Sequence, residues 1–575
     1  MRSNILVKGG GLFFLISAMF FATPVLGKTN IIFIMTDDVG YGDLGSYGAT
    51  VVRTPNLDIL ASQGMRFTNA HSEASVCSPS RFSMLTGVYA WRPPALSNGI
   101  LSPTAALTIP TTQLTVASLL KGAGYTTAVV GKWHLGLGSG TLDFNAAITP
   151  GPREIGFDYS FIIPSTGDRI PCVYLENRNV YKYNASEPIT IGNPGTPTGT
   201  SNPGMLLYPA DVQHSGTICN GISRIGLFNG GQSARWNDEF MIDTLTDKAI
   251  RFIENNQSNP FFLYFSTHDV HVPRWPDPRF RGQSQCGIRC DALMEMDWSV
   301  GQIMATLTRL NLNDSTLLIF SSDNGPVIED GYTDGSQANL NGHTPSGPLT
   351  GGKYDMTEGG ARVPFIARWP GRIPAGSVNA QLIAQQDMMA TFAAMNNLTL
   401  PGGVCWDTKN ILPTLQNINV VSRTSLIVQN NQAANLAILS GDYKLIRNAG
   451  ALYNLRMNLA ETNNIAAANA ALVTRLRDSI TVAQNCVPTP IRNFGGNPVM
   501  NTTRFCSAIF GKRALRIDPH FAPPGTKFTI FRSADGKKVY QSALWSSDIV
   551  LPSSGIFVVT AHTGLGTLLN SIVVD

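Results

Sequence analysis

The sequence predicts an α/β fold built around a central, mostly parallel sheet. Four short runs are almost wholly apolar, as strands buried on both faces of a sheet are: residues 30–35, 126–130, 261–265 and 316–320. Three other stretches carry apolar residues at helical spacing: residues 114–122, 243–255 and 292–310. This alternation of buried strands with helices is typical of a parallel sheet whose two faces are covered by helices.

Each of the four predicted strands is followed at once by polar residues. The segments concerned are Thr36-Asp37-Asp38, Gly131-Lys132, Ser266-Thr267-His268 and Ser321-Ser322-Asp323-Asn324. In open α/β sheets, ligands bind beyond the carboxyl ends of the strands. The sequence therefore predicts one site at one edge of the sheet, assembled from four distant segments.

The chain of 575 residues is too long for one small hydrophobic core, and its character changes twice. The α/β pattern covers residues 28–415. Residues 416–510 contain a predicted pair of short strands at 437–447 and a predicted helix at 467–482, and so predict a smaller α+β subdomain. The last part, residues 511–575, contains strand-like segments and predicts a small terminal β domain; the segments are 527–531, 538–540, 555–559 and 571–575.

Residues 1–27 have the pattern of an export signal peptide. Arg2 and Lys8 supply positive charge, residues 12–22 form an apolar core, and Val25-Leu26-Gly27 resembles a cleavage site. The alternative is a transmembrane anchor, but the apolar run is short against the ~20 residues that cross a bilayer. We expect an exported protein that is periplasmic, attached to the cell surface or secreted.

Composition and charge argue against a nucleic-acid partner. The chain is 43% hydrophobic and 14% charged, and its 42 basic and 38 acidic residues give a formal net charge of +4. No run of basic residues stands out. These values are those of an ordinary folded protein.

Eight cysteines are compatible with disulfides in an exported protein. Cys286 with Cys290, and Cys486 with Cys506, are plausible pairs. The absence of any Cys-x-x-Cys pair argues against a zinc ribbon or a thioredoxin-type site.

Hard oxygen ligands are available at two of the strand ends. Asp37 and Asp38 follow one strand, and Asp323 and Asn324 follow another. Oxygen ligands favour Ca²⁺ or Mg²⁺ over zinc. Taken alone, an Asp-Asp pair after a strand is better explained by a turn or a helix cap.

The segment Cys77–Gly87 decides between these interpretations. It contains Cys-x-Pro-x-Arg followed at fixed distance by Leu-Thr-Gly. Without its neighbours, Cys77 would be read as a small buried hydrophobic residue. Together with Pro79 and Arg81 it resembles the signature of type I sulfatases, in which this cysteine is oxidised to formylglycine.

The resemblance to type I sulfatases covers about residues 28–470. Further elements that carry it are Gly131–Gly136, Gly156–Tyr159, Glu358–Pro364, Trp369–Gly371, Asp442–Ile446 and Leu452–Leu455. Asn454 departs from the family, which commonly has Asp at this position. The resemblance implies an alkaline-phosphatase-like α/β sandwich with a smaller C-terminal subdomain.

The resemblance also implies a cofactor and a maturation step. Cys77 would become a formylglycine hydrate, with one hydroxyl that binds the metal and attacks sulfur and a second that later expels sulfate. The metal would be held by Asp37, Asp38, Cys77, Asp323 and Asn324, and by resemblance to the family would be Ca²⁺ rather than Mg²⁺. The converting partner would be a formylglycine-generating enzyme or an anaerobic sulfatase-maturating enzyme.

Three further catalytic roles follow from motifs near Cys77. Arg81 would hold the aspartate carboxylates and the hydrate. Lys132 and His134 belong to Gly-Lys-Trp-His-Leu-Gly, which resembles the family's element of the same sequence. Lys132 would contact sulfate, and His134 would accept the proton of the second hydroxyl.

Two more roles come from later segments. His271, two residues before Pro273, matches the family histidine that protonates the leaving oxygen, although His268 and Asp269 are close enough to be confused with it. Lys353 matches the family lysine that bridges a sulfate oxygen and the leaving oxygen. Several fixed cations around the reacting sulfate are the expected electrostatic device.

Two loop segments give a more particular resemblance. Residues 164–174 and 220–226 resemble the bacterial N-acetylgalactosamine-6-sulfatase branch, which implies removal of 6-O-sulfate from galactose or N-acetylgalactosamine in sulfated glycans. The candidate sugar-binding residues are Asp168, Arg169, His214 and His343. An ordinary loop salt bridge or a surface histidine explains these residues equally well.

The C-terminal segment resembles another kind of domain. Its Gly-Lys-x-Val-Tyr and Leu-Pro-Ser-x-Gly-Ile-Phe pattern resembles the sorting domain of type IX secretion substrates, which implies the type IX machinery as a partner. The alternative is a small β accessory domain that contacts carbohydrate.

Two other functions compete with a sulfatase. Some phosphonate and phosphate ester hydrolases of the same superfamily also carry Cys-x-Pro-x-Arg, although a single set of metal ligands argues against a two-metal phosphatase. The other alternative is a non-catalytic module that binds sulfated glycans, which the complete set of catalytic residues disfavours.

Overall fold

The computed structural model describes residues 28–92, 96, 99–192, 206–402 and 406–486, and beyond them the backbone of strands between residues 506 and 574. The expected signal peptide lies outside the described residues, and so does the side chain of Cys506, the expected partner of Cys486. In the described part of the chain, no helix combines the length and the apolar character needed to cross a membrane.

A ten-stranded sheet forms the centre of the protein, in the order β15-β2-β14-β13-β1-β12-β4-β5-β6-β7. Its middle five strands run parallel to one another: β13 (Thr316–Ser322), β1 (Asn30–Thr36), β12 (Phe261–Ser266), β4 (Thr126–Lys132) and β5 (Tyr159–Ile163). The flanking strands are β14 (Phe365–Arg368), β2 (Met65–Phe67), β15 (Ser377–Asn379), β6 (Leu175–Glu176) and β7 (Asn179–Val180). Antiparallel pairing begins at β14 on one side and at β6 on the other, so the predicted mostly parallel sheet is confirmed.

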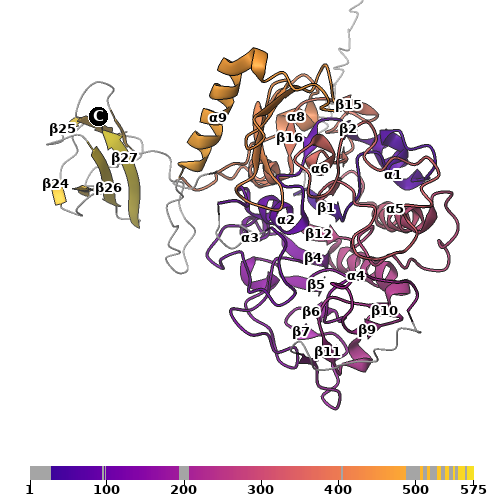
Figure 1. Cartoon of the computed structure of the whole chain (residues 1–575). Coiled ribbons are helices and arrows are strands. Elements are labelled where there is room, and N and C mark those ends of the chain that lie inside the picture. Colours follow the sequence, from indigo (N-terminus) through magenta and orange to yellow (C-terminus); the bar gives the residue numbers. More distant parts are fainter. Residues whose placement is uncertain are drawn as a thin grey trace, which may run out of the picture.

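Helices cover both faces of this sheet, as Figure 1 shows. One group packs together on one face: α1 (Pro55–Gln63), α4 (Met241–Asn256) and α5 (Gly287–Arg309). The other group comprises α2 (Cys77–Thr86), α3 (Val116–Gly122) and α7 (Met388–Met395). Because both faces are covered, every residue of β1, β12 and β13 is buried, which explains their uninterrupted apolar sequences.

Short elements complete this domain. Helix α6 (Glu358–Ala361) precedes β14, and α8 (Leu412–Gln416) follows α7. Small two-stranded sheets are formed by β3 (Ala70–His71) with β16 (Ile383–Ala384), β8 (Thr190–Ile191) with β11 (Phe228–Asn229), and β9 (Ile218–Cys219) with β10 (Ile222–Ser223).

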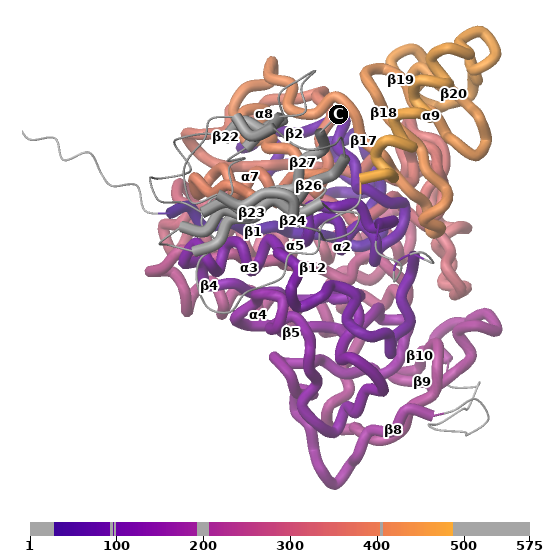
Figure 2. Tube along the Cα trace, turned by 90° about the vertical axis from the view of Figure 1, so that its left-hand side faces the viewer, coloured from indigo at the N-terminus to yellow at the C-terminus, as the bar shows by residue number. Residues whose placement is uncertain are grey.

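A four-stranded antiparallel sheet forms the smaller subdomain. Its strands are β17 (Ser425–Gln429), β18 (Leu436–Ser440), β19 (Tyr443–Ile446) and β20 (Ala451–Asn454), and α9 (Ala470–Gln484) packs against it. Gly441 and Asp442 form the turn that joins β18 to β19. Figures 1 and 2 show this sheet and α9 at one end of the molecule and β9 and β10 at the other.

The last strands form two further antiparallel sheets. One has the order β21 (Cys506–Ala508), β22 (Ala514–Ile517), β25 (Asp548–Val550), and the other β24 (Lys538–Ser542), β23 (Lys527–Arg532), β26 (Gly555–Thr563), β27 (Gly566–Val574). The predicted terminal β domain is therefore present. Strand β21 pairs with β22, so the sheet begins before the boundary predicted at residue 511.

Candidate active site

The carboxyl ends of four parallel strands bring their polar residues together. Asp37 and Asp38 follow β1, His134 lies two residues beyond β4, and Asp323 follows β13. All four side chains are buried. The Nζ of Lys132, the last residue of β4, lies 2.5 Å from Asp37 Oδ2. His271, five residues beyond β12, approaches Asp38 Oδ2 to 3.9 Å, so the four distant segments meet at one edge of the sheet.

The cluster of oxygen ligands fits a hard cation. The amide nitrogen of Asn324 donates to Asp38 Oδ1 at 2.7 Å, and the backbone N–H of Asp38 donates to Asp323 Oδ1 at 3.3 Å. Asp37 Oδ1 and Asn324 Oδ1 are buried and accept no hydrogen bond from any described residue. Buried oxygens without a partner are costly, and a divalent cation would satisfy them.

The electrostatics of this cluster also favour a bound cation. Burial raises the pKa of the Asp37 carboxyl well above its usual range, and the nearby Asp323 and Asp38 add to this against the opposing effect of Lys132. Burial also raises the pKa of Asp38. Carboxylates packed this closely are stabilised in their charged form by a bound cation.

His271 lies beside the expected ligand cluster, a proximity that the sequence did not predict. Ligand atoms of Asp37, Asp38 and His271 all lie within 4.8 Å of one another. Asp323 is instead engaged by Arg81, whose Nη2 and Nε lie 2.7 Å and 2.9 Å from Asp323 Oδ2. The position of Arg81 agrees with its expected role of holding an aspartate carboxylate.

Cys77 is the first residue of α2 and is 1% exposed. Burial raises the pKa of its thiol, so the unmodified side chain is a poor nucleophile at neutral pH. Its Sγ lies 3.2 Å from His134 Nδ1. Because His134 Nε2 lies 3.1 Å from the Leu101 carbonyl oxygen, Nε2 carries the proton and the Nδ1 lone pair faces residue 77.

Two histidines are held neutral by their surroundings. Burial and the positive charge of Lys132 lower the pKa of His134 well below its usual value, and burial together with Lys353 does the same for His271. A neutral His134 is ready to accept a proton. His271 Nδ1 donates to the Val272 carbonyl oxygen at 2.7 Å, which leaves its Nε2 facing Asp38 at 3.9 Å.

A cavity of about 380 Å³ opens over these residues. Its lining includes Cys77, His134, His271 and Lys353. Lys353 Nζ lies 3.0 Å from Asp38 Oδ2. The cavity thus brings together the expected nucleophile, both expected proton-transfer histidines and one of the expected cations.

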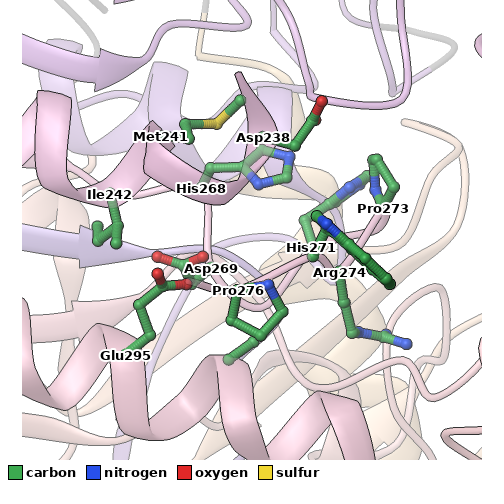
Figure 3. Close-up of a pocket in the computed structure, with 12 residues that line it drawn as sticks. Asp238, Met241, Ile242, His268, Asp269, His271, Pro273, Arg274, Pro276 and Glu295 are labelled. Carbon is green, nitrogen blue, oxygen red and sulfur yellow. The ribbon is translucent and has the colours of Figure 1, made fainter. Parts of the chain in front are cut away.

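A separate small pocket, shown in Figure 3, explains why His271 differs from its neighbours. His268 and Asp269 line this pocket, whereas only His271 of the three also lines the large cavity. His268 Nε2 accepts the backbone N–H of Gly167 at 2.9 Å, and the Asp269 carboxyl points towards Glu295 (Figure 3). His268 and Asp269 therefore do not line the cavity that contains Cys77.

Three of the four candidate sugar-binding residues line the large cavity. Arg169 Nη1 lies 2.9 Å from Asp168 Oδ2, and His214 Nε2 lies 3.3 Å from the same oxygen. His214 Nδ1 contacts Asp211 Oδ1 at 2.7 Å. Burial lowers the pKa of His214, but its contacts with Asp168 and Asp211 outweigh burial and raise the pKa above its usual value.

The fourth candidate, His343, is not among the residues that line this cavity. Its Nε2 lies 2.7 Å from Asp43 Oδ1, and the same carboxylate binds Arg289 at 2.6 Å. All three side chains are buried. The Nε2 atom of His343 is therefore engaged in a contact inside the protein.

Among the residues that line the cavity, those that the sequence did not predict include Gln213, Asp330 and Tyr354. Asp330 Oδ2 lies 2.9 Å from Lys353 Nζ, and the Tyr354 hydroxyl lies 3.3 Å from the same oxygen. Tyr354 directly follows Lys353 and was within reach of the motif. Asp330 stands in a loop without any recognisable pattern.

Among the described cysteines, one predicted pair is confirmed. Cys286 and Cys290 form a disulfide at the start of α5. Cys172 and Cys219 are buried as free thiols.

Several known proteins are similar to this chain in sequence. The profile of the family described as Sulfatase matches residues 29–397. N-acetylgalactosamine-6-O-sulfatase of Bacteroides thetaiotaomicron is 45% identical over 474 residues, which are 78% of this chain and 92% of that protein. Human arylsulfatase A is 34% identical over 413 residues, or 72% of each protein, and human N-acetylgalactosamine-6-sulfatase is 32% identical over 415 residues, or 68% and 67%.

Solved structures agree with the sequence matches. A protein from a study of glycosaminoglycan metabolism by Bacteroides thetaiotaomicron superposes with a TM-score of 0.76 at 44% identity, covering 80% of this chain and 99% of that one. A phosphonate monoester hydrolase of Agrobacterium radiobacter shares the fold at a TM-score of 0.50 and 17% identity, covering 80% and 95%. The matched profile spans more than half of the chain and includes every strand of the parallel core, so the protein belongs to the sulfatase family of sulfuric ester hydrolases.

Proposed function

We propose that this sulfatase removes 6-O-sulfate from galactose or N-acetylgalactosamine residues of sulfated glycans. The single observation that carries the proposal is the cavity in which Cys77, His134, His271 and Lys353 share one space with Asp168. The first four of these residues suit sulfate chemistry, and Asp168 suits the hydroxyl groups of a sugar. The names of the Bacteroides and human relatives support the 6-sulfate assignment.

Calcium is the proposed cation, held by the oxygens of Asp37, Asp38, Asp323 and Asn324 at the strand ends. The all-oxygen donor set and the two unpartnered buried oxygens support a hard cation. When bound, the cation would act as a Lewis acid that stabilises negative charge developing at the sulfate. Formylglycine at position 77 would supply the nucleophilic oxygen, which an unactivated thiol does not offer.

The remaining chemistry belongs to this chain's own side chains. Lys353 reaches the cavity with its ammonium group and can neutralise a sulfate oxygen. His134 presents the Nδ1 lone pair towards residue 77 and would accept a proton there. His271 Nε2 lines the same cavity and, once protonated, would donate to the leaving sugar oxygen.

Bound sulfate ester favours that protonated state of His271. In the empty cavity, burial and Lys353 hold the pKa of His271 low. A sulfate ester carries a negative charge, and an opposite charge close to an imidazolium raises its pKa. Substrate binding would therefore help to load the proton that the leaving group requires.

Asp168 and Arg169 are proposed to select the sugar. Arg169 and His214 outweigh the effect of burial and hold the pKa of Asp168 well below its usual range, so the carboxylate is charged and accepts hydrogen bonds from hydroxyl groups. Buried polar groups of this kind discriminate strongly between substrates that do and do not satisfy them.

We also propose the steps that precede catalysis. The chain would be exported, and Cys77 would be converted by a formylglycine-generating enzyme or an anaerobic sulfatase-maturating enzyme. The terminal sheets would serve as a type IX secretion sorting domain. The catalytic domain and the smaller subdomain are proposed to divide near residue 415, and the terminal domain to begin at β21, a few residues before the boundary at residue 511 expected from the sequence.

The test is sulfate release from defined monosaccharides by enzyme co-expressed with a maturating enzyme. We expect sulfate release from 6-sulfated N-acetylgalactosamine or 6-sulfated galactose. Release from 4-sulfated N-acetylgalactosamine should be at least about 100-fold slower, because buried hydrogen-bonding groups can discriminate between substrates by more than this factor. Cys77→Ala is the matched inactive control. Equal rates on the 4- and 6-sulfates, or faster hydrolysis of an aryl phosphonate than of an aryl sulfate, would overturn the assignment.

A further inference from the structure

A buried cluster of five charged or titratable side chains lies between the catalytic domain and the smaller subdomain and lines no part of the large cavity. We call it the cross-domain charge cluster. Its members are His71, Glu358, Arg362, Lys444 and Glu461, none of which is more than 9% exposed. The mechanism proposed above uses none of them.

Glu358 is the centre of the cluster. Its Oε1 lies 2.9 Å from Lys444 Nζ, and its Oε2 lies 3.0 Å from both His71 Nε2 and Arg362 Nη1. Lys444 Nζ also lies 3.0 Å from Glu461 Oε1. Glu461 Oε2 accepts the backbone N–H of Glu358.

The cluster joins parts of the chain that are distant in sequence. Glu358 is the first residue of α6, Lys444 lies in β19 of the small sheet, and Glu461 follows β20. Buried charges are retained in a fold only when each has partners of good geometry. Lys444 and Glu461 therefore fix α6 to the small sheet through directed contacts that apolar packing would not provide.

The other side of α6 is built into the active site. The Gly360 carbonyl accepts the backbone N–H of Gly325, the residue after Asn324, at 2.8 Å. The segment before α6 carries Lys353, whose N–H donates to the Pro326 carbonyl at 2.9 Å.

Helix α6 is tightly packed against these segments. A Cβ added at Gly360 would lie 2.2 Å from the Asp355 carbonyl oxygen and 2.9 Å from Ser75 Cβ. Tyr354 N–H donates to the Ser75 carbonyl at 2.8 Å, and Ser75 lies two residues before Cys77. A displacement of α6 would therefore be passed on to Lys353 and to the segment that precedes Cys77.

The small sheet also contacts that second segment directly. Ser75 N–H donates to the Gln429 carbonyl at 3.0 Å, and Gln429 N–H donates to the Glu73 carbonyl at 3.0 Å. Gln429 is the last residue of β17. The small sheet thus supports both sides of the reacting centre.

We propose that Lys444 and Glu461 are positioning residues, which act through Glu358 and α6 to hold Lys353 in place over the reacting sulfate. The proposal rests on the function proposed above, since it gives Lys353 a task at the sulfate. The alternative is that the cluster only fastens the subdomain to the rest of the protein.

Hydrogen exchange separates these two explanations without any substrate. In Lys444→Met, we expect amide exchange in residues 350–361 to rise by about tenfold, because local opening of this segment becomes easier. Lys121→Met is the matched control, since Lys121 has an ion pair of 2.7 Å with Asp158 but is 50% exposed and far along the chain from α6. Faster exchange confined to residues 425–454, with residues 350–361 unchanged, would overturn the proposal.

A double-mutant cycle on an aryl sulfate provides the kinetic arm. Lys444→Met should lower kcat/KM by about tenfold in the wild-type background and leave it unchanged in a Lys353→Met background, because residues that act through one another are not additive. Equal losses of kcat/KM in both backgrounds, or no loss in the wild-type background, would contradict the positioning role of Lys444.

Glu461→Gln removes the outer member of the cluster and serves if Lys444→Met does not fold, with the same expected directions. Loss of glycan activity with the exchange result intact would count against the proposed function alone.

Discussion

The two halves of the cavity are built in different ways. The half that suits sulfate chemistry stands over residues that directly follow buried parallel strands, such as Asp37 after β1 and Asp323 after β13, and takes only Cys77 from the start of α2 and Lys353 from a loop. The half that suits the sugar comes from loops, with Asp168 and His214 brought together from segments 46 residues apart. The strand-end half is fixed by the topology of the sheet, whereas the loop half is fixed only by its own side-chain contacts.

This difference predicts how each half responds to change. Substitutions at the strand ends should remove turnover on every sulfate ester. Substitutions in the loops should change which ester is accepted and leave the chemistry in place. The following experiments are ordered from the largest expected effect to the smallest.

Replacing Cys77 should abolish turnover. We expect Cys77→Ala to lower kcat by at least about 10⁴-fold, since removal of a nucleophile costs rates of this order or more. Because the thiol is buried at the start of α2 and makes one contact to His134, the thermal midpoint should change little. Initial rates on an aryl sulfate and a calorimetric scan measure both; residual activity within tenfold of wild type would exclude position 77 as the nucleophile.

Removal of the proposed Ca²⁺ should lower turnover almost as much as replacement of Cys77. Exhaustive chelation should lower turnover by about 10³-fold, in keeping with the several kcal/mol that a Lewis-acid cation supplies. Ca²⁺ should restore activity better than Mg²⁺. It should also raise the thermal midpoint in wild type but not in Asp37→Asn, because binding to the folded state alone stabilises it. A midpoint that does not respond to Ca²⁺ would count against the site.

Loss of the Lys353 ammonium group at the sulfate should have a smaller effect on activity. Lys353→Met should lower kcat/KM by about 10²-fold, the loss typical of one preorganised charge in a reacting site. Lys121→Met, a largely exposed lysine that also has a carboxylate partner, is the control. Equal rates for the two variants would show that Lys353 serves only to neutralise Asp38 and Asp330.

His214 should affect stability in a pH-dependent way. Its pKa is raised in the folded protein, so its contribution to the free energy of unfolding is fully present below the ordinary histidine value near pH 6.5 and is lost as pH rises through the folded value. We expect His214→Gln to be destabilised by about 2 kcal/mol at pH 5.5, the scale of hydrogen bonds to charged groups, and by much less at pH 9. Urea unfolding at both pH values measures this; a difference that grows with pH would contradict the assigned sign.

The same contrast explains what could be predicted from sequence. The strand ends were predictable because buried parallel strands have a distinctive apolar pattern and their carboxyl ends must share one edge. The contact of His343 with Asp43 and that of Lys353 with Asp330 were not predictable, because each joins loop residues whose approach depends on the whole fold. No periodicity marks such loops, so neither the Asp43 contact of His343 nor the place of Asp330 in the cavity wall was predicted.

The division of labour between the two halves can be measured directly as a ratio. The rate on a 6-sulfated sugar is divided by the rate on a simple aryl sulfate, for wild type, His134→Gln and Asp168→Asn. His134→Gln should lower both rates and leave the ratio within about twofold, while Asp168→Asn should lower the ratio by about 10²-fold, since only the sugar needs that carboxylate. Equal losses on both substrates in Asp168→Asn would contradict the claim that strand ends perform the chemistry and loops select the sugar.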